Sequence, residues 1–507
     1  MSVPDGGGAD YVVVGGGTAG SVLAARLSEN PDVTVVLVEV GGASAPEAPP
    51  QEWPALLNTE VDWAFASVPQ QGLGGRVVPY PRGRVLGGSS AINAMAHVRG
   101  HRLNYDQWLA EGAPGWGYDD LLPYFRRSER APGRDSRYRG TDGPMEVAPG
   151  AAVHPFMEIA RDAVAELGLA LTDDLSGACQ EGAGLVDKNI VHGTRQSVAD
   201  AYLRPVMHSR QNLTVLTGAQ VTRLLVRGGA CEGVRLALAD GSAEEVRAGE
   251  VILCGGVFGS PQLLMLSGIG PAAELRGHGI DVTADLPGVG SHLQDHPVCS
   301  LVFAAGREIP RRPDTGALLA ALRSGPELAA PDLQLMFIEY PFFPLTGTDV
   351  PGGFSITVQA LRPRSRGRVT LASPDPLAAP LIDPAFYGDG TDMDAMLRGL
   401  RLARELSAAK AFDGLRTGEL VPGPGVVTDG QLRGFLREAT HSAAHPVGTC
   451  RIGMDSSSVV DTSLRVHGVA RLRVADAAVM PSLIGASINA TVLAIAEKAA
   501  DLITTGH

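Results

Sequence analysis

The chain has 507 residues, of which 44% are hydrophobic and 19% charged, a balance typical of a soluble globular protein. This length exceeds what one hydrophobic core usually holds, so we expect two or three domains or one large two-lobed body. The formal net charge of −13 argues against nucleic acid or an anionic membrane as the main partner, because both require a basic surface.

The N-terminal segment predicts a β-α-β unit. Asp10–Val14 is short and rich in β-branched residues, as in a buried strand, and a second such run, VTVVLVE, ends at Glu39. Between them, SVLAARLSEN carries Val22, Leu23 and Leu27 at helical spacing. The order and size of this unit are typical of one mononucleotide-binding half of a Rossmann-like domain.

The turn between the first strand and the helix contains Gly15, Gly17 and Gly20 in a GxGxxG pattern. Gly15 allows the tight turn, Gly17 lets a pyrophosphate approach the backbone, and Gly20 lets the helix pack against the strand. Glu39 is placed to bind ribose hydroxyls. The pattern disfavours NADP, whose 2′-phosphate this carboxylate would repel, and leaves NAD and FAD as alternatives.

The segments that follow predict loops and short elements. The proline-rich residues 43–54 predict an extended loop, and GRVLGGSS (83–90) predicts a glycine-rich turn that leads into a helix over residues 91–100. The polar residues 128–144 predict a surface loop.

The remaining elements divide between two regions of the fold. We predict that the nucleotide domain continues with strands and helices over residues 213–225, 231–238, 251–256, 259–271, 471–475 and 490–503. Between residues 271 and 471, we predict strands over 332–340 and 354–361 and a helix over 392–412, which belong to a different region of the fold. Because strands of the nucleotide domain occur at the start, middle and end of the chain, we expect interleaved domains.

Four segments together resemble the glucose–methanol–choline (GMC) oxidoreductases, and most of all their choline-dehydrogenase-like branch. They are residues 10–29, 81–95 (PRGRVLGGSSAINAM), 259–271 (GSPQLLMLSGIGP) and 445–501. The resemblance implies an α/β fold with a Rossmann-like FAD-binding domain (1–155, 190–300 and 440–507). This domain is interleaved with an α+β substrate-binding domain built on an antiparallel sheet (156–189 and 301–439).

The resemblance also implies FAD and oxidation of a CH–OH group by hydride transfer to flavin N5. It places the Gly87–Ala94 region at the pyrophosphate and isoalloxazine, Val221 at the adenine and Asp476 near the ribityl chain. Ala91 stands where some relatives carry a histidine bound covalently to flavin, so we expect noncovalent FAD. The cofactor-binding residues expected are Gly15, Gly17, Thr18, Ala19, Gly20, Glu39, Gly87, Gly88, Ser89, Asn93, Ala94, Val221, Asp476, Ala477, Asn489 and Ala490.

The paired active-site residues of the family fall on His445 and Asn489. Alcohol oxidation requires removal of the hydroxyl proton by a group with a near-neutral pKa, which suits His445 as the general base. Pro446 restricts the backbone of His445 to extended conformations. We expect Asn489 to hold the alcohol oxygen, and the helix that starts near Ala490 to stabilise negative charge at flavin N1.

Several alternatives stay open. His441 and His445 have i, i+4 spacing, but Pro446 and Gly448 argue against the helix that metal binding at this spacing requires. His292 and His296 have the same spacing but no third ligand nearby, so we expect no metal site. The roles of His97, His292 and His296 are unassigned; loop, capping or helix-packing roles are the simplest. A lyase or other non-redox activity on the same scaffold is the alternative function. The alcohol, the oligomeric state, and the choice between O₂ and another electron acceptor are not predicted.

The substrate wall is expected on strand 332–340, with Met336 or Phe337 as contacts. No cage of aromatics and an acid for a choline-like cation is evident, although Glu339 and Tyr340 keep choline open.

The cysteines and the N-terminus point to the cytoplasm. The five cysteines are scattered, odd in number and form no CxxC motif, which argues against a disulfide framework or a zinc site. The N-terminal residues lack the basic and apolar regions of a signal peptide, and no apolar run is long enough for a transmembrane helix. We therefore predict a cytoplasmic enzyme that acts on a small-molecule alcohol, without an integral membrane segment.

Overall fold

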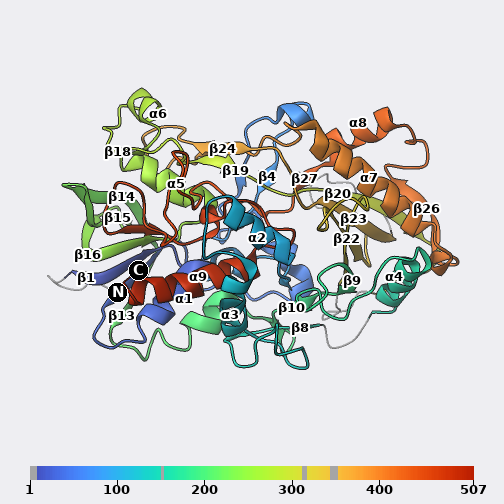
Figure 1. Ribbon diagram of the computed structural model, residues 1–507, viewed down its shortest axis with the longest axis horizontal. Helices are drawn as coiled ribbons and strands as arrows, with labels where there is room; N and C mark the ends of the chain where they lie inside the picture. The colour runs from blue at the N-terminus through green and yellow to red at the C-terminus, as the bar shows by residue number, and fades with distance from the viewer. Residues whose placement is uncertain (1–7, 150–153, 311–316, 343–351, 507) are drawn as a thin grey trace.

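The computed structural model describes residues 8–149, 154–310, 317–342 and 352–506, and two large sheets organise these residues (Figure 1). No helix in these four ranges has both the length and the apolar character needed to cross a lipid bilayer. The α-helices are α1 (Thr18–Leu27), α2 (Arg102–Ala110), α3 (Tyr118–Ser128), α4 (Pro155–Glu166), α5 (Gly256–Leu266), α6 (Ala272–Gly277), α7 (Gly390–Ser407), α8 (Asp429–Ala439) and α9 (Asn489–Thr504).

The first sheet has the strand order β13-β2-β1-β16-β15-β14, with β28 also paired to β16. Its parallel part is formed by β13 (Leu213–Thr217), β2 (Val35–Glu39), β1 (Ala9–Val14), the end of β16 (Ala243–Leu253) and β28 (Leu472–Val474). Its antiparallel part is formed by the start of β16 with β15 (Ala230–Leu238) and β14 (Ala219–Arg227). Strands from the start, middle and end of the chain meet here, which confirms the expected Rossmann-like, interleaved arrangement.

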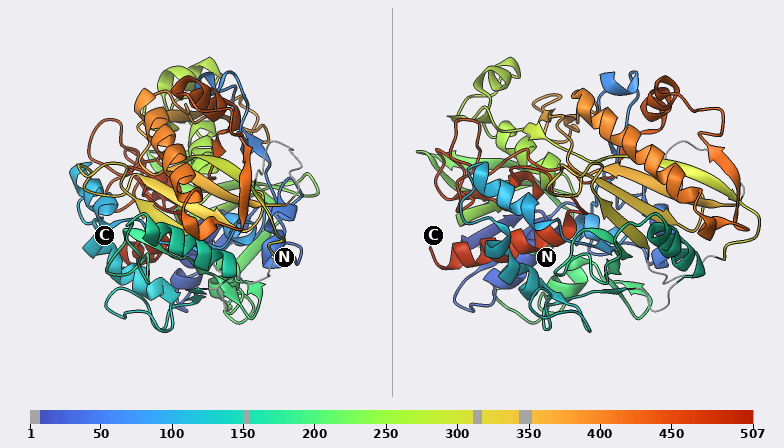
Figure 2. Two further views of the ribbon diagram at one scale, coloured as in Figure 1. Left: turned by 90° about the vertical axis from the view of Figure 1, so that its right-hand side faces the viewer. Right: turned by 45° about the vertical axis from the view of Figure 1, so that its right-hand side comes forward.

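The second sheet is antiparallel, as expected, with the order β26-β20-β23-β22-β21-β9 and with β27 paired to β20. Helices α4 and α7 lie against it in both views of Figure 2. Alternate residues of its strands therefore face these helices or the opposite side of the sheet. Its strands are β9 (Gly182–Leu185), β20 (Pro297–Ala305), β21 (Leu318–Leu322), β22 (Leu333–Ile338), β23 (Phe354–Ala360), β26 (Arg416–Val421) and β27 (His441–Ser442).

Helices α1 and α9 pack side by side beneath the first sheet (Figure 1), and a buried carboxylate holds them in register. The side chain of Glu497 on α9 is fully buried and accepts hydrogen bonds from Arg26 of α1 (2.8 Å) and Tyr202 (2.7 Å). Arg127 of α3 completes the group, with its Nε 2.8 Å from Glu497 Oε2. Three partners from separate segments thus compensate the burial of one charge.

Two local predictions are wrong. Residues 91–100 do not form a helix: after the short 3₁₀ turn Gly88–Ala91 the chain bends, with Met95 at φ 60°, into the short strand β5 (Ala96–His97). The polar segment 128–144 is not simply a surface loop, because Glu129 and Arg139 in it are fully buried and paired at 2.6 Å. Because Glu129 and Arg139 pair with each other, both charges can be buried, although the polar composition of the segment predicts that they are exposed.

Replacing Glu497 tests the link between α1 and α9. Glu497→Gln keeps the shape of the side chain but removes the charge that compensates Arg26, so the free energy of unfolding should fall by about 3 kcal/mol in denaturant titration. The matched control is Glu29→Gln, since Glu29 also pairs with Arg26 but is 49% exposed; it should cost less than about 0.5 kcal/mol. Equal effects of the two substitutions would contradict this role.

Candidate active site

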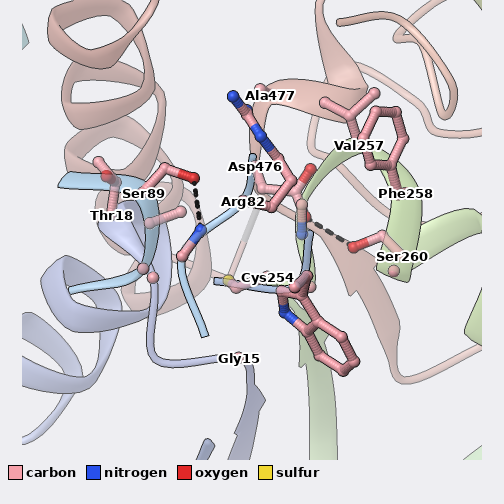
Figure 3. A pocket seen from close by; sticks show the side chains of 18 of the residues that line it. Gly15, Thr18, Arg82, Ser89, Cys254, Val257, Phe258, Ser260, Asp476 and Ala477 are labelled. Carbon is pink, nitrogen blue, oxygen red and sulfur yellow. Dashed lines mark hydrogen bonds between the residues drawn. The ribbon is translucent and has the colours of Figure 1, made fainter. Parts of the chain in front are cut away.

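A cavity of about 390 Å³ lies at the carboxyl ends of β1, β2 and β16, where α1 and α9 begin (Figure 3). Ligands of open α/β sheets bind at this edge, and the volume lies in the range of small-molecule sites. The residues expected from sequence that line it are Gly15, Gly17, Thr18, Ala19, Glu39, Gly88, Ser89, Asn93, Ala94, Val221, His445, Asp476, Ala477 and Asn489.

The glycine turn leaves its backbone open to the cavity. Gly15 has φ 101°, and a Cβ there would lie 2.5 Å from the carbonyl oxygen of Cys254, so only glycine fits. A Cβ on Gly17 would enter cavity space, since the nearest atom, the Cα of Gly88, is 3.9 Å away. A phosphate group can therefore approach the N-terminus of α1 closely, where the helix dipole favours negative charge.

Three expected residues do not line the cavity, and two of them, Gly20 and Gly87, hold the glycine loops together instead. Gly20 lies where α1 crosses β1, and a Cβ there would be 1.8 Å from the carbonyl oxygen of Gly15. Gly87 has φ 91° and donates its N–H to Gly16 O at 2.8 Å, which joins the two glycine loops. Ala490 is buried in the first turn of α9.

Two buried carboxylates flank the cavity. Glu39 accepts the N–H groups of Gly16 (2.7 Å) and Gly41 (2.8 Å), and burial raises its pKa to about 7 despite these bonds. Asp476 accepts from Gly256 N (2.8 Å) and from the Ser260 hydroxyl (2.6 Å), as Figure 3 shows for Ser260, and burial raises the pKa of Asp476. Each carboxylate therefore fixes a loop at the cavity edge.

The N-termini of α1 and α9 meet at the cavity. The hydroxyl of Thr18 donates to Asn489 Oδ1 at 2.8 Å, so the carbonyl oxygen of this amide is engaged. The Nδ2 group of Asn489 is then the part of the side chain that can donate a hydrogen bond to a ligand. Two positive helix ends and an amide donor thus converge on one point.

His445 reaches the cavity from the segment that follows β27. Its backbone N–H donates to Asp295 Oδ1 at 3.0 Å. Both oxygens of Asp295 are used, because the hydroxyls of Tyr80 and Ser442 donate to Oδ2. Asp295 therefore places the main chain of His445 and does not contact its ring.

The ring of His445 packs against a second histidine, His296. The two rings are perpendicular, with their Nδ1 atoms 3.1 Å apart. His296 Nε2 lies 3.3 Å from the carbonyl oxygen of Leu361, which can only accept, so we assign the His296 proton to Nε2. His296 Nδ1 must then accept from His445 Nδ1–H, which leaves the lone pair of His445 on Nε2.

Burial keeps both rings neutral. It lowers the pKa of His296 to about 3. It also lowers the pKa of His445 well below its ordinary value, and the positive charges of His296, when protonated, and of Arg82 act in the same direction. A neutral ring keeps a free lone pair on Nε2, which is the state that a general base requires, but the lowered pKa makes His445 a weaker base than the near-neutral group expected from sequence.

Sequence reasoning missed the contact of His296 with His445 and the cavity-lining Arg82. The guanidinium of Arg82 donates to the carbonyl oxygen of Ala444 at 2.6 Å, next to His445. A sequence signal was present for Arg82, which lies in the PRGR segment that carries the resemblance. For His296 there was none, because its partner lies on a distant segment.

Other candidate residues fall outside the cavity. Phe337 was a wrong choice as a substrate contact: it packs in the core on the α7 side of the second sheet, whereas Met336 faces the opposite way. His97 is buried and pairs with Glu129 at 2.9 Å. Where the chain is described, no group of three or more His, Cys, Asp or Glu side chains is arranged to hold a metal ion.

Comparison with known proteins gives matches along nearly the whole chain. Two domains described as GMC oxidoreductase match residues 9–298 and 363–496. An oxygen-dependent choline dehydrogenase of Rhizobium etli is 39% identical, over 98% of this chain and 95% of its own length.

Two solved structures share the fold. Pyridoxine 4-oxidase from Mesorbium loti has a TM-score of 0.93 and 34% identity, covering 98% of this chain and 100% of its own. A formate oxidase from Aspergillus oryzae has a TM-score of 0.92 and 30% identity, covering 100% of this chain and 99% of its own.

The raised pKa of Glu39 predicts a pH-dependent stability of the apoprotein. A carboxyl group whose pKa rises from 4.5 to about 7 on folding stabilises the fold at low pH. That contribution, on the order of 3 kcal/mol, is lost as the pH rises through this interval. Denaturant titration from pH 4.5 to 7.5 should show a decline in wild type that Glu39→Gln reduces. Parallel curves for the two proteins would contradict the raised pKa.

Proposed function

Because the chain belongs to the GMC oxidoreductase family, we propose that it oxidises a small alcohol to a carbonyl compound with His445 as the general base. The family makes the chain an FAD-dependent oxidoreductase that acts on CH–OH donors. The observation that carries the proposal is the single cavity in which His445 and Asn489 lie beside the dinucleotide loop.

The residues of the cavity fit FAD. The open backbone at Gly17 and the N-terminus of α1 suit the pyrophosphate, and Glu39 at the end of β2 suits the ribose hydroxyls. Asp476, with Ala477 after it, suits the region between the pyrophosphate and the ribityl chain. Ala91 has no nucleophilic atom, so the proposal includes noncovalent FAD.

Bound FAD supplies the acceptor for the hydride that leaves the carbinol carbon. His445 Nε2 takes the hydroxyl proton, while Nδ1–H stays bonded to His296 and keeps the ring in the required tautomer. The electrons of the O–H bond form the carbonyl double bond. The acceptor role of Nε2 therefore depends on the hydrogen-bond chain that ends at the carbonyl oxygen of Leu361.

Asn489 positions the alcohol and does not exchange protons. Its Oδ1 is bonded to Thr18, so its Nδ2 donates to the alcohol oxygen, where negative charge develops as the proton leaves. The N-terminus of α9 would stabilise negative charge at N1 of bound flavin.

Dioxygen is the proposed oxidant of the reduced enzyme. The support comes from the relatives, since one is named oxygen-dependent and the two structural matches are named oxidases.

Replacing His445 tests the base. His445→Ala should retain bound flavin but slow anaerobic flavin reduction by an alcohol about 10²–10⁴-fold, measured by loss of visible flavin absorbance. The matched control is His441→Ala: His441 is also buried, on β27, but does not line the cavity. Its rate should stay within a few-fold of wild type. Unchanged reduction in His445→Ala would refute the role of His445.

The oxidant is tested by peroxide release. Aerobic turnover of an alcohol that bleaches the flavin should produce one H₂O₂ for each carbonyl formed. Fast anaerobic bleaching without reoxidation by air, but with reoxidation by a quinone or dye, would instead identify a dehydrogenase.

A further inference from the structure

The peptide bond between Ala444 and His445 lies between two opposite charges. Its carbonyl oxygen accepts a hydrogen bond of 2.6 Å from Nη2 of Arg82, which lines the cavity (Figure 3). Its N–H donates to Oδ1 of Asp295 at 3.0 Å. A peptide group has negative partial charge on its oxygen and positive partial charge on its N–H. The guanidinium and the carboxyl group therefore stabilise the same orientation of this peptide.

Four donors surround the buried carboxyl group of Asp295. Oδ1 accepts two backbone N–H groups, and Oδ2 accepts the hydroxyls of Tyr80 and Ser442. The oxygen of Ser442 itself accepts the N–H of Ala444 at 2.8 Å, which leaves its hydrogen for Asp295. Burial raises the pKa of Asp295, but hydrogen bonds from four donors favour the charged form, so we treat the group as a carboxylate.

Neither charge belongs to an ion pair within the residues that the structure describes. Arg82 donates only to main-chain carbonyl oxygens, and Asp295 accepts only from hydroxyl and N–H groups. Burial lowers the pKa of Arg82 and raises that of Asp295, and each group partly offsets this effect on the other. Tyr80 and Asp62 also act on Arg82, but Asp62 accepts its backbone N–H, at 2.8 Å. The two charges thus compensate each other across one peptide bond.

The backbone conformation at this peptide is a disfavoured one. Ala444 has φ 60°, in the left-handed region that residues with a Cβ rarely adopt. On the other side of His445, Pro446 restricts the backbone to extended conformations. Such a conformation persists only where the surrounding contacts determine it. The charged contacts on both ends of the Ala444–His445 peptide supply that constraint.

The same two charges act on the ring of His445 in opposite directions. Besides burial, the groups that lower its pKa are His296 and Arg82. A positive charge disfavours the protonated ring, whereas the negative charge of Asp295, which is bonded to the His445 backbone, favours it. Loss of either charge alone should therefore change the pKa of His445, and loss of both should largely cancel.

We propose that Arg82 and Asp295 act as one positioning unit for the ring of His445, holding the Ala444–His445 peptide between their opposite charges. The inference rests on the proposed function, in which this ring is the general base. Neither Arg82 nor Asp295 exchanges a proton with the alcohol. The glycine-rich segment that carries Arg82 and the segment before β20 that carries Asp295 therefore place the base jointly.

The pH dependence of flavin reduction tests the pair in the holoenzyme, with benzyl alcohol or whichever alcohol bleaches the wild type fastest. Arg82→Gln removes a positive charge, so the acid limb of kcat/KM should move up by about one pH unit. Asp295→Asn should move the limb down by a similar amount, and the double variant should lie near wild type. If the wild-type limb lies below the pH at which flavin is released, Arg82→Gln should bring it into range. A limb in Arg82→Gln that is not above that of wild type would overturn the inference.

The rate at neutral pH reports the placement of the ring. Arg82→Gln and Asp295→Asn should each slow flavin reduction at saturating alcohol about 10²-fold, with less than about threefold change in the half-saturating concentration. Arg82→Lys keeps the charge and a donor for the carbonyl of Ala444, so it should recover most of the rate and the wild-type pH profile. If Asp295→Asn loses its flavin, the Arg82 variants decide alone: equal profiles for Gln and Lys would overturn the inference.

A second arginine–aspartate pair provides matched controls. Arg366 likewise donates only to main-chain carbonyl oxygens, and Asp392, which raises its pKa, is buried and accepts N–H and hydroxyl groups. Neither residue lines the cavity. Arg366→Gln and Asp392→Asn should leave the acid limb and the rate within about twofold of wild type. Shifts equal to those of the Arg82 and Asp295 variants would mean a general effect of charge and overturn the inference.

The same substitutions in His445→Ala separate this inference from the proposed function. Arg82→Gln and Asp295→Asn should slow His445→Ala less than about threefold further, because the pair acts through the ring. If His445→Ala is slow but both substitutions still slow it 10²-fold, the inference fails and the oxidation stands. If His445→Ala is as fast as wild type, the proposed base fails. A pH titration of the flavin absorbance, which needs no substrate, would then still support the positioning of the ring if Arg82→Gln and Asp295→Asn shift it oppositely, and would overturn it if they do not.

Discussion

The contact between α1 and α9 is the constraint on which the site depends. Glu497, fully buried, is bound by Arg26 of α1 and Arg127 of α3, so the two helices cannot slide without exposing or unpairing a charge. Their register brings Thr18 and Asn489 within hydrogen-bonding distance at the cavity. The dinucleotide loop before α1 and the proposed alcohol-binding amide of Asn489 are therefore both positioned by the contact between α1 and α9, although almost the whole chain separates them in sequence.

The proposed base depends on a second constraint, from the other sheet. The tautomer of His445 follows from a chain of two hydrogen bonds through His296 to the carbonyl of Leu361. That carbonyl is placed by β23, and His296 is placed by β20, which pairs with β23. The proton positions on His445 and His296 are thus tied to strand pairing in the second sheet.

Sequence patterns predicted the parts of the site whose geometry is local. The turn around Gly15 and Gly17 and the carboxylate of Glu39 belong to one β-α-β unit, so spacing alone placed them together. Resemblance to a family supplied His445 and Asn489, which no local pattern joins. His296 was not predicted, because its role requires the pairing of β20 with β27, and neither strand shows its partner in sequence. The buried pair of Glu129 and Arg139 was missed for another reason, because charged residues in a polar segment are expected to be exposed to solvent.

The interleaved order of the first sheet has a consequence for biosynthesis. Strand β1 is synthesised long before its neighbour β16, which ends at Leu253, and β28 (Leu472–Val474) and α9 (from Asn489) come later still. One edge of β1 therefore stays unpaired until β16, about halfway along these 507 residues, has been synthesised. The nascent chain is exposed to aggregation through that edge until β16 arrives, and the cavity is complete only after Asn489 and α9 have been added.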